Sequence, residues 1–241
     1  MSVSLSRSIA LVTLISATYA QNIIVAAASD LSTLQEPLAQ LFRAKAGVEV
    51  RFTFGSSGVL ARQIENGAPF DVFLSANRMY VAELARSGRL EAGTVRVYAL
   101  GRLGLWSRDG RIREVEQLRS AGVKHVALPN PQHAPYGVAA VELLRREGLW
   151  AALESKVVYG ENVRQALQFA DSGNADAAIT AWSLVVDRGG VELPPEHAPI
   201  EQAGGVVAGT RYEGRARAVL DALASPEGRR VLMGHGLMPP R

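Results

Sequence analysis

From Asn22 onward, short apolar runs alternate with longer segments whose apolar residues recur every three or four positions. Continuous apolar runs such as Asn22–Ala28 (NIIVAAA) are typical of strands buried on both faces of a sheet. The longer segments are typical of helices with one buried face, as in Leu31–Ala46. Pro37 interrupts that helix and predicts a loose turn before the helix proper, because proline is tolerated only in a first turn.

The same alternation continues to the end of the chain. Further strands are predicted at Val48–Phe54, Asp71–Ser75, Val95–Trp106 (two runs joined near Gly101), His125–Leu128, Lys156–Tyr159, Ala177–Ala181 and Val206–Gly209. Further helices are predicted at Val59–Glu65, Tyr80–Ser87, Val138–Glu147, Val163–Ser172, Ser183–Asp187 (a helix or a turn), Ala216–Ala224 and Pro226–His235. This order favours an α/β fold with mostly parallel sheets, since parallel strands need helical crossovers.

The length of 241 residues allows two lobes, although no low-complexity linker separates them. We therefore expect the chain to cross between lobes on strands, near Leu100–Gly101 and Ile200–Gly204. This places lobe 1 at residues 21–100 and 203–241 and lobe 2 at residues 101–202.

The first twenty residues have the three-part form of a secretory signal peptide. Arg7 is the single cation of a short polar start, Ile9–Ala17 is an apolar run, and Thr18 and Ala20 are small residues before a cleavage point at Gln21. We expect residues 1–20 to be removed on export to the periplasm. No later segment reaches the ~18 continuous apolar residues of a membrane span.

The amino-acid composition excludes several classes of site and partner. The chain carries a formal charge of +3 with 48% hydrophobic residues, as a folded protein does. It has no Cys, which excludes a disulfide scaffold, a thiol nucleophile and a Cys-ligated metal. Its 26 cations form no long run, so nucleic acid is not an expected partner.

Enzyme motifs are missing as well. The chain contains no H-x-x-x-H zinc spacing and no phosphate-binding G-x-x-x-x-G-K-[ST] motif. The run Gly55-Ser56-Ser57-Gly58 fails the G-x-S-x-G pattern of a nucleophile elbow. The four histidines are expected to be surface or loop residues, with His133 near the mouth of the cleft. We therefore expect no catalytic residues and no enzyme.

The most informative residues stand where a predicted strand passes into a helix. Four such junctions carry small, hydroxyl or amide residues: Ala28-Ser29-Asp30, Gly55-Ser56-Ser57-Gly58, residues 130–137 (NPQHAPYG) and Gly160-Glu161-Asn162-Val163. Each offers free backbone N–H groups and the positive end of a helix dipole, which together bind anions without a cationic side chain. Two junctions in each half, facing one another across a cleft, predict a shared anion site.

These residues also carry a family resemblance. The stretches NIIVAAASDL, FTFGSSGVLARQIENGAPFDVFLSA, NPQHAPYGVAA and GENVRQAL resemble the periplasmic molybdate-binding proteins of ABC transporters. The resemblance runs from about Asn22 to Met238. It implies two α/β lobes of the periplasmic-binding-protein type, joined by two crossover strands, which close on a bare tetrahedral oxyanion without a cofactor.

The resemblance also implies the ligand residues. Ser29 and Ser57 match hydroxyl donors, Tyr136 matches the APYG turn and its phenol is expected to contact the anion, and Val163 matches a backbone N–H donor. Asp30 stands where one branch of the family has a contacting Asn. Because a carboxylate repels a dianion, we expect only its backbone N–H to bind, with its side chain capping the helix. Molybdenum or tungsten would be held by these residues only within the oxyanion, not as a bare cation.

The resemblance thus implies a monomeric carrier that takes molybdate, and also tungstate, to a membrane permease. A carrier of the same fold for sulfate or another small anion is the alternative, since the donors suit sulfate equally and only cavity size excludes it. Phosphate would favour an acceptor carboxylate in the site, a role open to Asp30. A sensory or adhesive domain of this fold is a third class.

Overall fold

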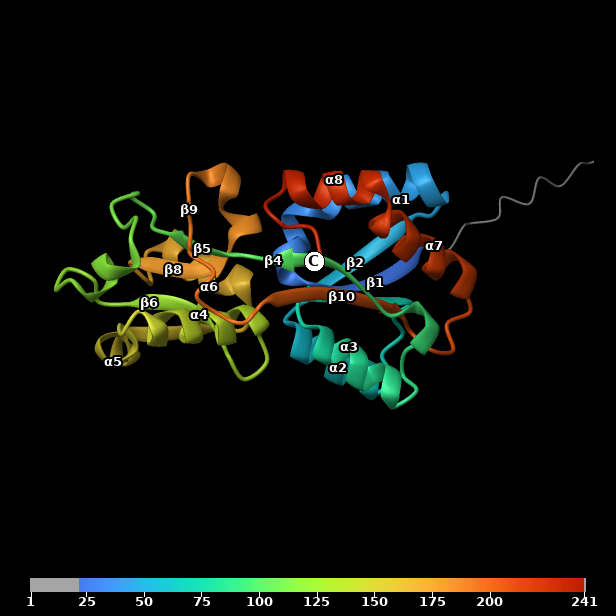
Figure 1. Ribbon diagram of the computed structural model, residues 1–241, viewed down its shortest axis with the longest axis horizontal. Helices are drawn as coiled ribbons and strands as arrows, with labels where there is room; N and C mark the ends of the chain where they lie inside the picture. Colours follow the sequence, from blue (N-terminus) through green and yellow to red (C-terminus); the bar gives the residue numbers. More distant parts are fainter. Residues whose placement is uncertain (1–21, 241) are drawn as a thin grey trace, which may run out of the picture.

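The computed structural model describes residues 22–240, which form two five-stranded sheets lying side by side along the long axis of the molecule (Figure 1). We call each sheet with its helices a lobe. The signal peptide predicted at residues 1–20 lies outside the described residues. Within residues 22–240, no helix combines the length and apolarity needed to cross a membrane.

Lobe 1 holds the sheet with strand order β2-β1-β3-β10-β4. Its strands are β1 (Ile23–Ala28), β2 (Val50–Gly55), β3 (Val72–Ser75), β4 (Arg96–Gly101) and β10 (Ile200–Val206). The pairs β1–β2 and β1–β3 are parallel, whereas β10 runs antiparallel to both β3 and β4. The parallel strands therefore end at one edge of the sheet.

Helices cover both faces of this sheet (Figure 1). One layer contains α1 (Gln35–Ala46), α7 (Glu213–Ala224) and α8 (Pro226–Gly234), and the other contains α2 (Ser57–Glu65) and α3 (Arg78–Arg86). The 3₁₀ helix η1 (Ser29–Leu34) precedes α1, and the short η2 (Ala92–Thr94) precedes β4. Pro37 lies in the first turn of α1, which confirms the loose turn predicted before that helix.

Lobe 2 repeats the arrangement with strand order β7-β6-β8-β5-β9. Its strands are β5 (Leu103–Trp106), β6 (Val126–Pro129), β7 (Val157–Gly160), β8 (Ala177–Ala181) and β9 (Val191–Glu192). Its helices are α4 (Pro135–Arg146), α5 (Trp150–Leu153) and α6 (Val163–Ser172), with 3₁₀ turns η3 (Val115–Arg119), η4 (Glu154–Lys156), η5 (Trp182–Leu184) and η6 (Val186–Arg188). The strands β6, β7 and β8 are parallel.

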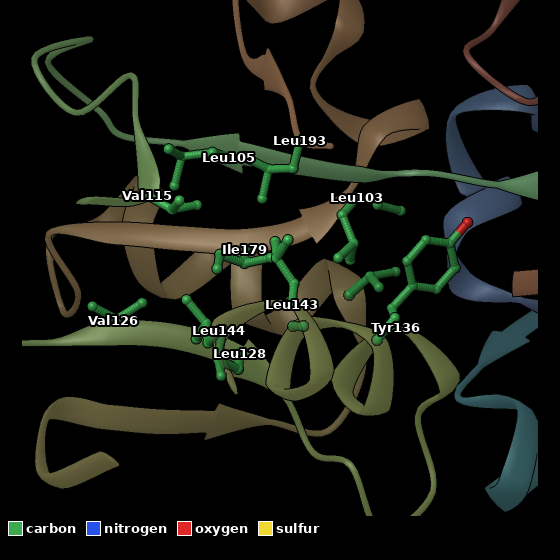
Figure 2. Close-up of a cluster of buried hydrophobic side chains, with 14 of the residues drawn as sticks. Leu103, Leu105, Val115, Val126, Leu128, Tyr136, Leu143, Leu144, Ile179 and Leu193 are labelled. Atoms are coloured by element: carbon green, nitrogen blue, oxygen red, sulfur yellow. The ribbon is translucent and has the colours of Figure 1, made fainter. Parts of the chain in front are cut away.

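The core of lobe 2 explains why its helices lie where they do. Leu143 and Leu144 of α4 pack with Leu128 of β6 and Ile179 of β8 in one buried cluster (Figure 2). On the opposite face, small alanines of α6 pack against alanines of β6 and β8, so this helix lies close to the sheet. The α/β fold of two helix-flanked sheets predicted from the sequence is confirmed.

The chain passes from the first sheet to the second between Gly101 and Leu103, and it returns between Glu192 and Ile200. The strand predicted at Val206–Gly209 is wrong, because the return strand β10 occupies Ile200–Val206. Its segment IEQAGGV is poor in β-branched residues, and its place between β3 and β4 holds it as a strand.

Candidate functional site

The four junctions singled out in the sequence meet at one cavity between the lobes. Residues 28–30 and 55–57 of lobe 1, with Ala76, face residues 134–136 and 162–163 of lobe 2. Each segment follows the carboxyl end of a parallel strand, where open α/β sheets bind ligands. All five residues expected at the anion site line this cavity: Ser29, Asp30, Ser57, Tyr136 and Val163.

The cavity is small, with a volume of about 10 Å³. That corresponds to roughly one water-sized sphere. An oxyanion of five atoms would therefore need more room than this arrangement of the lobes gives.

A larger hollow of about 840 Å³ lies in lobe 1, but at the opposite ends of the strands. Its lining includes Ile24, Arg51 and Asp71, at or just before the amino ends of β1, β2 and β3. None of the four helix starts borders it, so it is not the site that the sequence motifs build.

Three α-helices begin at the interlobe cavity. Ser57 and Val163 are the first residues of α2 and α6, and Tyr136 is the second residue of α4. N–H groups in a first turn have no carbonyl partner within their own helix. The side chain of Asn162 accepts hydrogen bonds from Arg164 and Gln165, which leaves the N–H of Val163 for a ligand. Converging helix N-termini make this wall attractive to an anion.

Two serine hydroxyls add to these donors. Ser57 Oγ accepts a hydrogen bond of 2.9 Å from the backbone N–H of Ala76, so its own hydrogen remains available for a ligand. Ser29 Oγ is buried and has no hydrogen-bond partner in the structure. Buried polar atoms of this kind are uncommon and need a partner.

Cations do not contribute to this wall. None of the described residues that line the cavity is Lys, Arg or His. Within the described part of the chain, no group of three or more His, Asp or Glu side chains could hold a metal ion. The polar groups of the lining are hydroxyls, backbone N–H groups, the Asn162 amide and the carboxyl group of Asp30.

His133 lies in the turn before α4, as expected of a loop residue near the cleft, and it is buried between the lobes. It is 7% exposed, and its ring Nδ1 lies 2.9 Å from Ser56 Oγ in the other lobe. Its carbonyl oxygen accepts a hydrogen bond of 2.9 Å from the N–H of Gly58. The ring Nε2 lies 3.7 Å from the carboxylate of Glu161. His133 thus joins the two lobes beside the cavity.

The expected helix cap by Asp30 is wrong. The Asp30 side chain makes no capping hydrogen bond to η1. Its Oδ2 instead accepts hydrogen bonds from the Tyr136 hydroxyl (3.0 Å) and from Gln202 Nε2 (2.8 Å), while Oδ1 has no partner. Asp30 is only 1% exposed, so its carboxyl group takes part in a buried network with lobe 2 and the return strand and does not cap the helix. Burial raises the pKa of Asp30 to about 6.

The phenol of Tyr136 likewise makes a different contact from the one expected. Figure 2 shows its hydroxyl pointing out of the lobe 2 core towards lobe 1. The single hydroxyl hydrogen is donated to Asp30, and the oxygen accepts a hydrogen bond of 3.1 Å from Gln202. Burial and the neighbouring Asp30 raise the pKa of Tyr136 well above its usual range, so it stays a donor. In this arrangement the hydroxyl hydrogen is committed to Asp30, and the backbone N–H, in the first turn of α4, has no carbonyl partner within its own helix.

Gln202 and Tyr98 are members of this network that the sequence motifs did not reveal. Gln202 is fully buried on the return strand β10, and its Oε1 accepts a hydrogen bond of 3.2 Å from the Tyr98 hydroxyl on β4. Gly101 leaves room for the network, since a Cβ at this position would overlap the Tyr136 hydroxyl. No local motif marks Gln202, because its partners are distant in the sequence.

Comparisons with known proteins agree with this geometry. A model of the bacterial extracellular solute-binding protein family matches residues 23–238. The chain belongs to this family. It is 34% identical to the molybdate-binding protein ModA of Rhodobacter capsulatus, over 90% of this chain and 88% of that protein. It is also 34% identical to ModA of Azotobacter vinelandii, over 98% of both chains.

The solved structure of the Azotobacter vinelandii periplasmic molybdate-binding protein superimposes with a TM-score of 0.86. It is 28% identical in the superposition, which covers 91% of this chain and all of that one. The resemblance noted in the sequence is thereby confirmed. The chain is a solute-binding protein and not an enzyme.

Proposed function

We propose that this solute-binding protein captures molybdate, and also tungstate, as a bare tetrahedral oxyanion. The observation that carries the proposal is the meeting of four strand-to-helix junctions, two from each lobe, at one small cavity without a cation. Its relatives from Rhodobacter capsulatus and Azotobacter vinelandii are molybdate-binding proteins.

In the proposed complex, the hydroxyls of Ser29 and Ser57 and the backbone N–H groups of Ser57, Tyr136 and Val163 donate to the oxyanion. Asp30 lines the same cavity on the lobe 1 side. Neutral donors spread the charge of a dianion over several dipoles, and a cavity of fixed size separates molybdate and tungstate from the smaller sulfate. The ligand closes the lobes because it contacts both of them.

We further infer that the carrier acts as a monomer in the periplasm and delivers the oxyanion to the permease of an ABC transporter. Closure over the ligand changes the relative position of the lobes, which gives a permease a means of telling the loaded carrier from the empty one. The signal-peptide pattern at residues 1–20 supports this location.

Isothermal titration calorimetry of residues 21–241 tests the proposal. Molybdate, tungstate, sulfate and phosphate are titrated separately at the same ionic strength. We expect sub-micromolar binding of molybdate and tungstate and no heat from sulfate or phosphate. Tighter binding of sulfate than of molybdate would show that sulfate is the ligand instead. Absence of binding by all four anions would overturn the proposal that the protein captures an oxyanion.

A further inference from the structure

Two buried polar atoms at the interlobe cavity lack partners, and one of them belongs to a carboxyl group. Asp30 Oδ1 and Ser29 Oγ are both unpartnered, and both residues line the cavity. The other carboxyl oxygen, Oδ2, already accepts hydrogen bonds from Tyr136 and Gln202. Oδ1 is therefore the atom of Asp30 that is left to meet a ligand.

Among the described residues, none that lines the cavity beside Asp30 is a cation that would neutralise it. Tyr136 of α4 and Tyr98 of β4 approach it as neutral hydroxyls, and the Ser183 hydroxyl of η5 donates to its backbone carbonyl (2.7 Å). The charged or titratable groups on the neighbouring elements lie outside the cavity lining: His133 behind Ser56, Glu161 facing His133, and Arg164, Asp171 and Arg188 in the outer groove that Ser29 borders.

We propose that Asp30 binds the oxyanion as the neutral carboxylic acid, with Oδ1–H as a donor, so that each oxyanion captured takes up one proton. The inference rests on the proposed function, because it requires a dianion in this cavity. The proton comes from solvent and stays on Asp30 while the ligand is bound. No covalent bond to the ligand forms or breaks.

The alternative state is an ionised carboxylate beside a dianion, in a closed cavity whose lining carries no cation. A dianion next to the carboxyl group disfavours ionisation of Asp30, and so does burial. Burial already raises the pKa of Asp30 to about 6, although the hydrogen bonds from Tyr136 and Gln202 act to lower it, and a bound dianion raises it further. The protonated acid instead converts the unpartnered Oδ1 into a hydrogen-bond donor, which is the role that the other groups on this wall have.

Proton uptake is measured by titrating molybdate into the protein at pH 7.5 in buffers with different ionisation enthalpies. For the wild-type protein we expect about one proton taken up per molybdate. We also expect its affinity to fall by up to about tenfold per pH unit above neutrality. Asp30→Asn supplies an amide donor without a proton and should bind molybdate with no uptake and with an affinity independent of pH.

Two controls locate the proton. Asp176→Asn alters a carboxylate of lobe 2 that accepts backbone N–H groups far from the cavity, and it should behave as the wild type. His133→Gln removes the nearest histidine and should retain the uptake. Loss of uptake in His133→Gln with retention in Asp30→Asn would overturn the proposal.

Titration of the wild-type protein tests the protonation of Asp30 even if none of the variants folds. Molybdate binding without proton uptake, and with equal affinity at pH 6 and pH 8, would overturn the role of Asp30 and leave the proposed function standing. Absence of molybdate binding at every pH would instead overturn the proposed function, and this inference with it.

Discussion

At the scale of single residues, the cavity depends on hydroxyl groups whose hydrogens are uncommitted. Ser57 is 1% exposed and its oxygen accepts the N–H of Ala76, which fixes the direction in which its hydrogen can be donated. Ser29 lies on the same side of the cavity with no partner at all. Such groups are costly to bury unless a ligand uses them. An oxyanion bound as proposed would give both hydroxyls an acceptor.

Replacing Ser57 with Ala removes one donor to the proposed oxyanion. We expect molybdate binding to weaken by about 1–3 kcal/mol, the range for a hydrogen bond to a charged group. Calorimetry measures the loss. The matched control is Ser87→Ala, since that hydroxyl donates to the Leu84 carbonyl at the end of α3, away from the cavity. Equal affinities of Ser57→Ala and wild type would remove this hydroxyl from the site.

At the scale of elements, the first residues of the helices form the cavity, so the position of each helix N-terminus decides where its backbone donors lie. The start of α4 packs tightly against the preceding loop, because a Cβ at Gly137 would overlap the carbonyl oxygen of Pro129. Gly160 is similarly close to α6, where a Cβ would lie 2.5 Å from the N–H nitrogen of Ala166. These glycines let two helix starts of lobe 2 approach the strand ends, and so they set where the N–H groups point.

Gly137→Ala tests this placement. The added methyl group meets backbone that cannot rotate away, so we expect a loss of stability of about 1–3 kcal/mol and weaker molybdate binding. Chemical denaturation and calorimetry measure the two effects. Gly122→Ala in the same lobe is the control, since nothing lies within 4 Å of its Cβ position. Unchanged affinity in Gly137→Ala would show that the start of α4 does not contact the ligand.

The elements themselves were largely predictable, because their signals are local. Apolar runs mark β1 and β3, and proline and glycine mark the limits of α1. The strand predicted at Val206–Gly209 is wrong, whereas β10 lies where a crossover strand was expected, near Ile200–Gly204. Its glycines and polar residues carry little strand signal, and its pairing with β3 and β4 decides its structure.

The site was predictable only in part, for the same reason. Turn residues at the four junctions are local signals, and the structure brings those junctions together. The contacts of Asp30 are not local: Tyr136 is 106 residues away and Gln202 is 172 residues away. Local reasoning therefore assigned Asp30 to a helix cap and Tyr136 to the ligand, whereas tertiary structure pairs them with each other.

At the scale of the whole molecule, the closed arrangement rests on contacts that cross between the lobes. Asp30 of lobe 1 pairs with Tyr136 of lobe 2, and the Thr33 hydroxyl donates to the Ser183 carbonyl (3.0 Å). Gln202 lies on the return strand and bonds to both members of the first pair. The contacts that hold the lobes together thus also position groups that line the cavity, so a change in the relative position of the lobes also alters the cavity.

Gly101→Ala separates closure from folding. Its methyl group would occupy the place of the Tyr136 hydroxyl, between the lobes rather than within either core. We expect a larger radius of gyration by small-angle X-ray scattering in the presence of molybdate and an affinity loss of about 1–3 kcal/mol. Gly93→Ala in lobe 1 is the control, because its Cβ position is open. Wild-type scattering and affinity in Gly101→Ala would contradict the interlobe role of Tyr136.

The central claim is that one oxyanion is held where the four helix starts meet. The most direct test is a crystal structure of the molybdate complex, with anomalous data collected at the molybdenum absorption edge. We expect a single strong peak in the interlobe cavity, with oxygen atoms within hydrogen-bonding distance of the Ser29 and Ser57 hydroxyls and the Val163 N–H. A peak elsewhere on the molecule, or no peak from a protein that had been saturated with molybdate, would contradict the account.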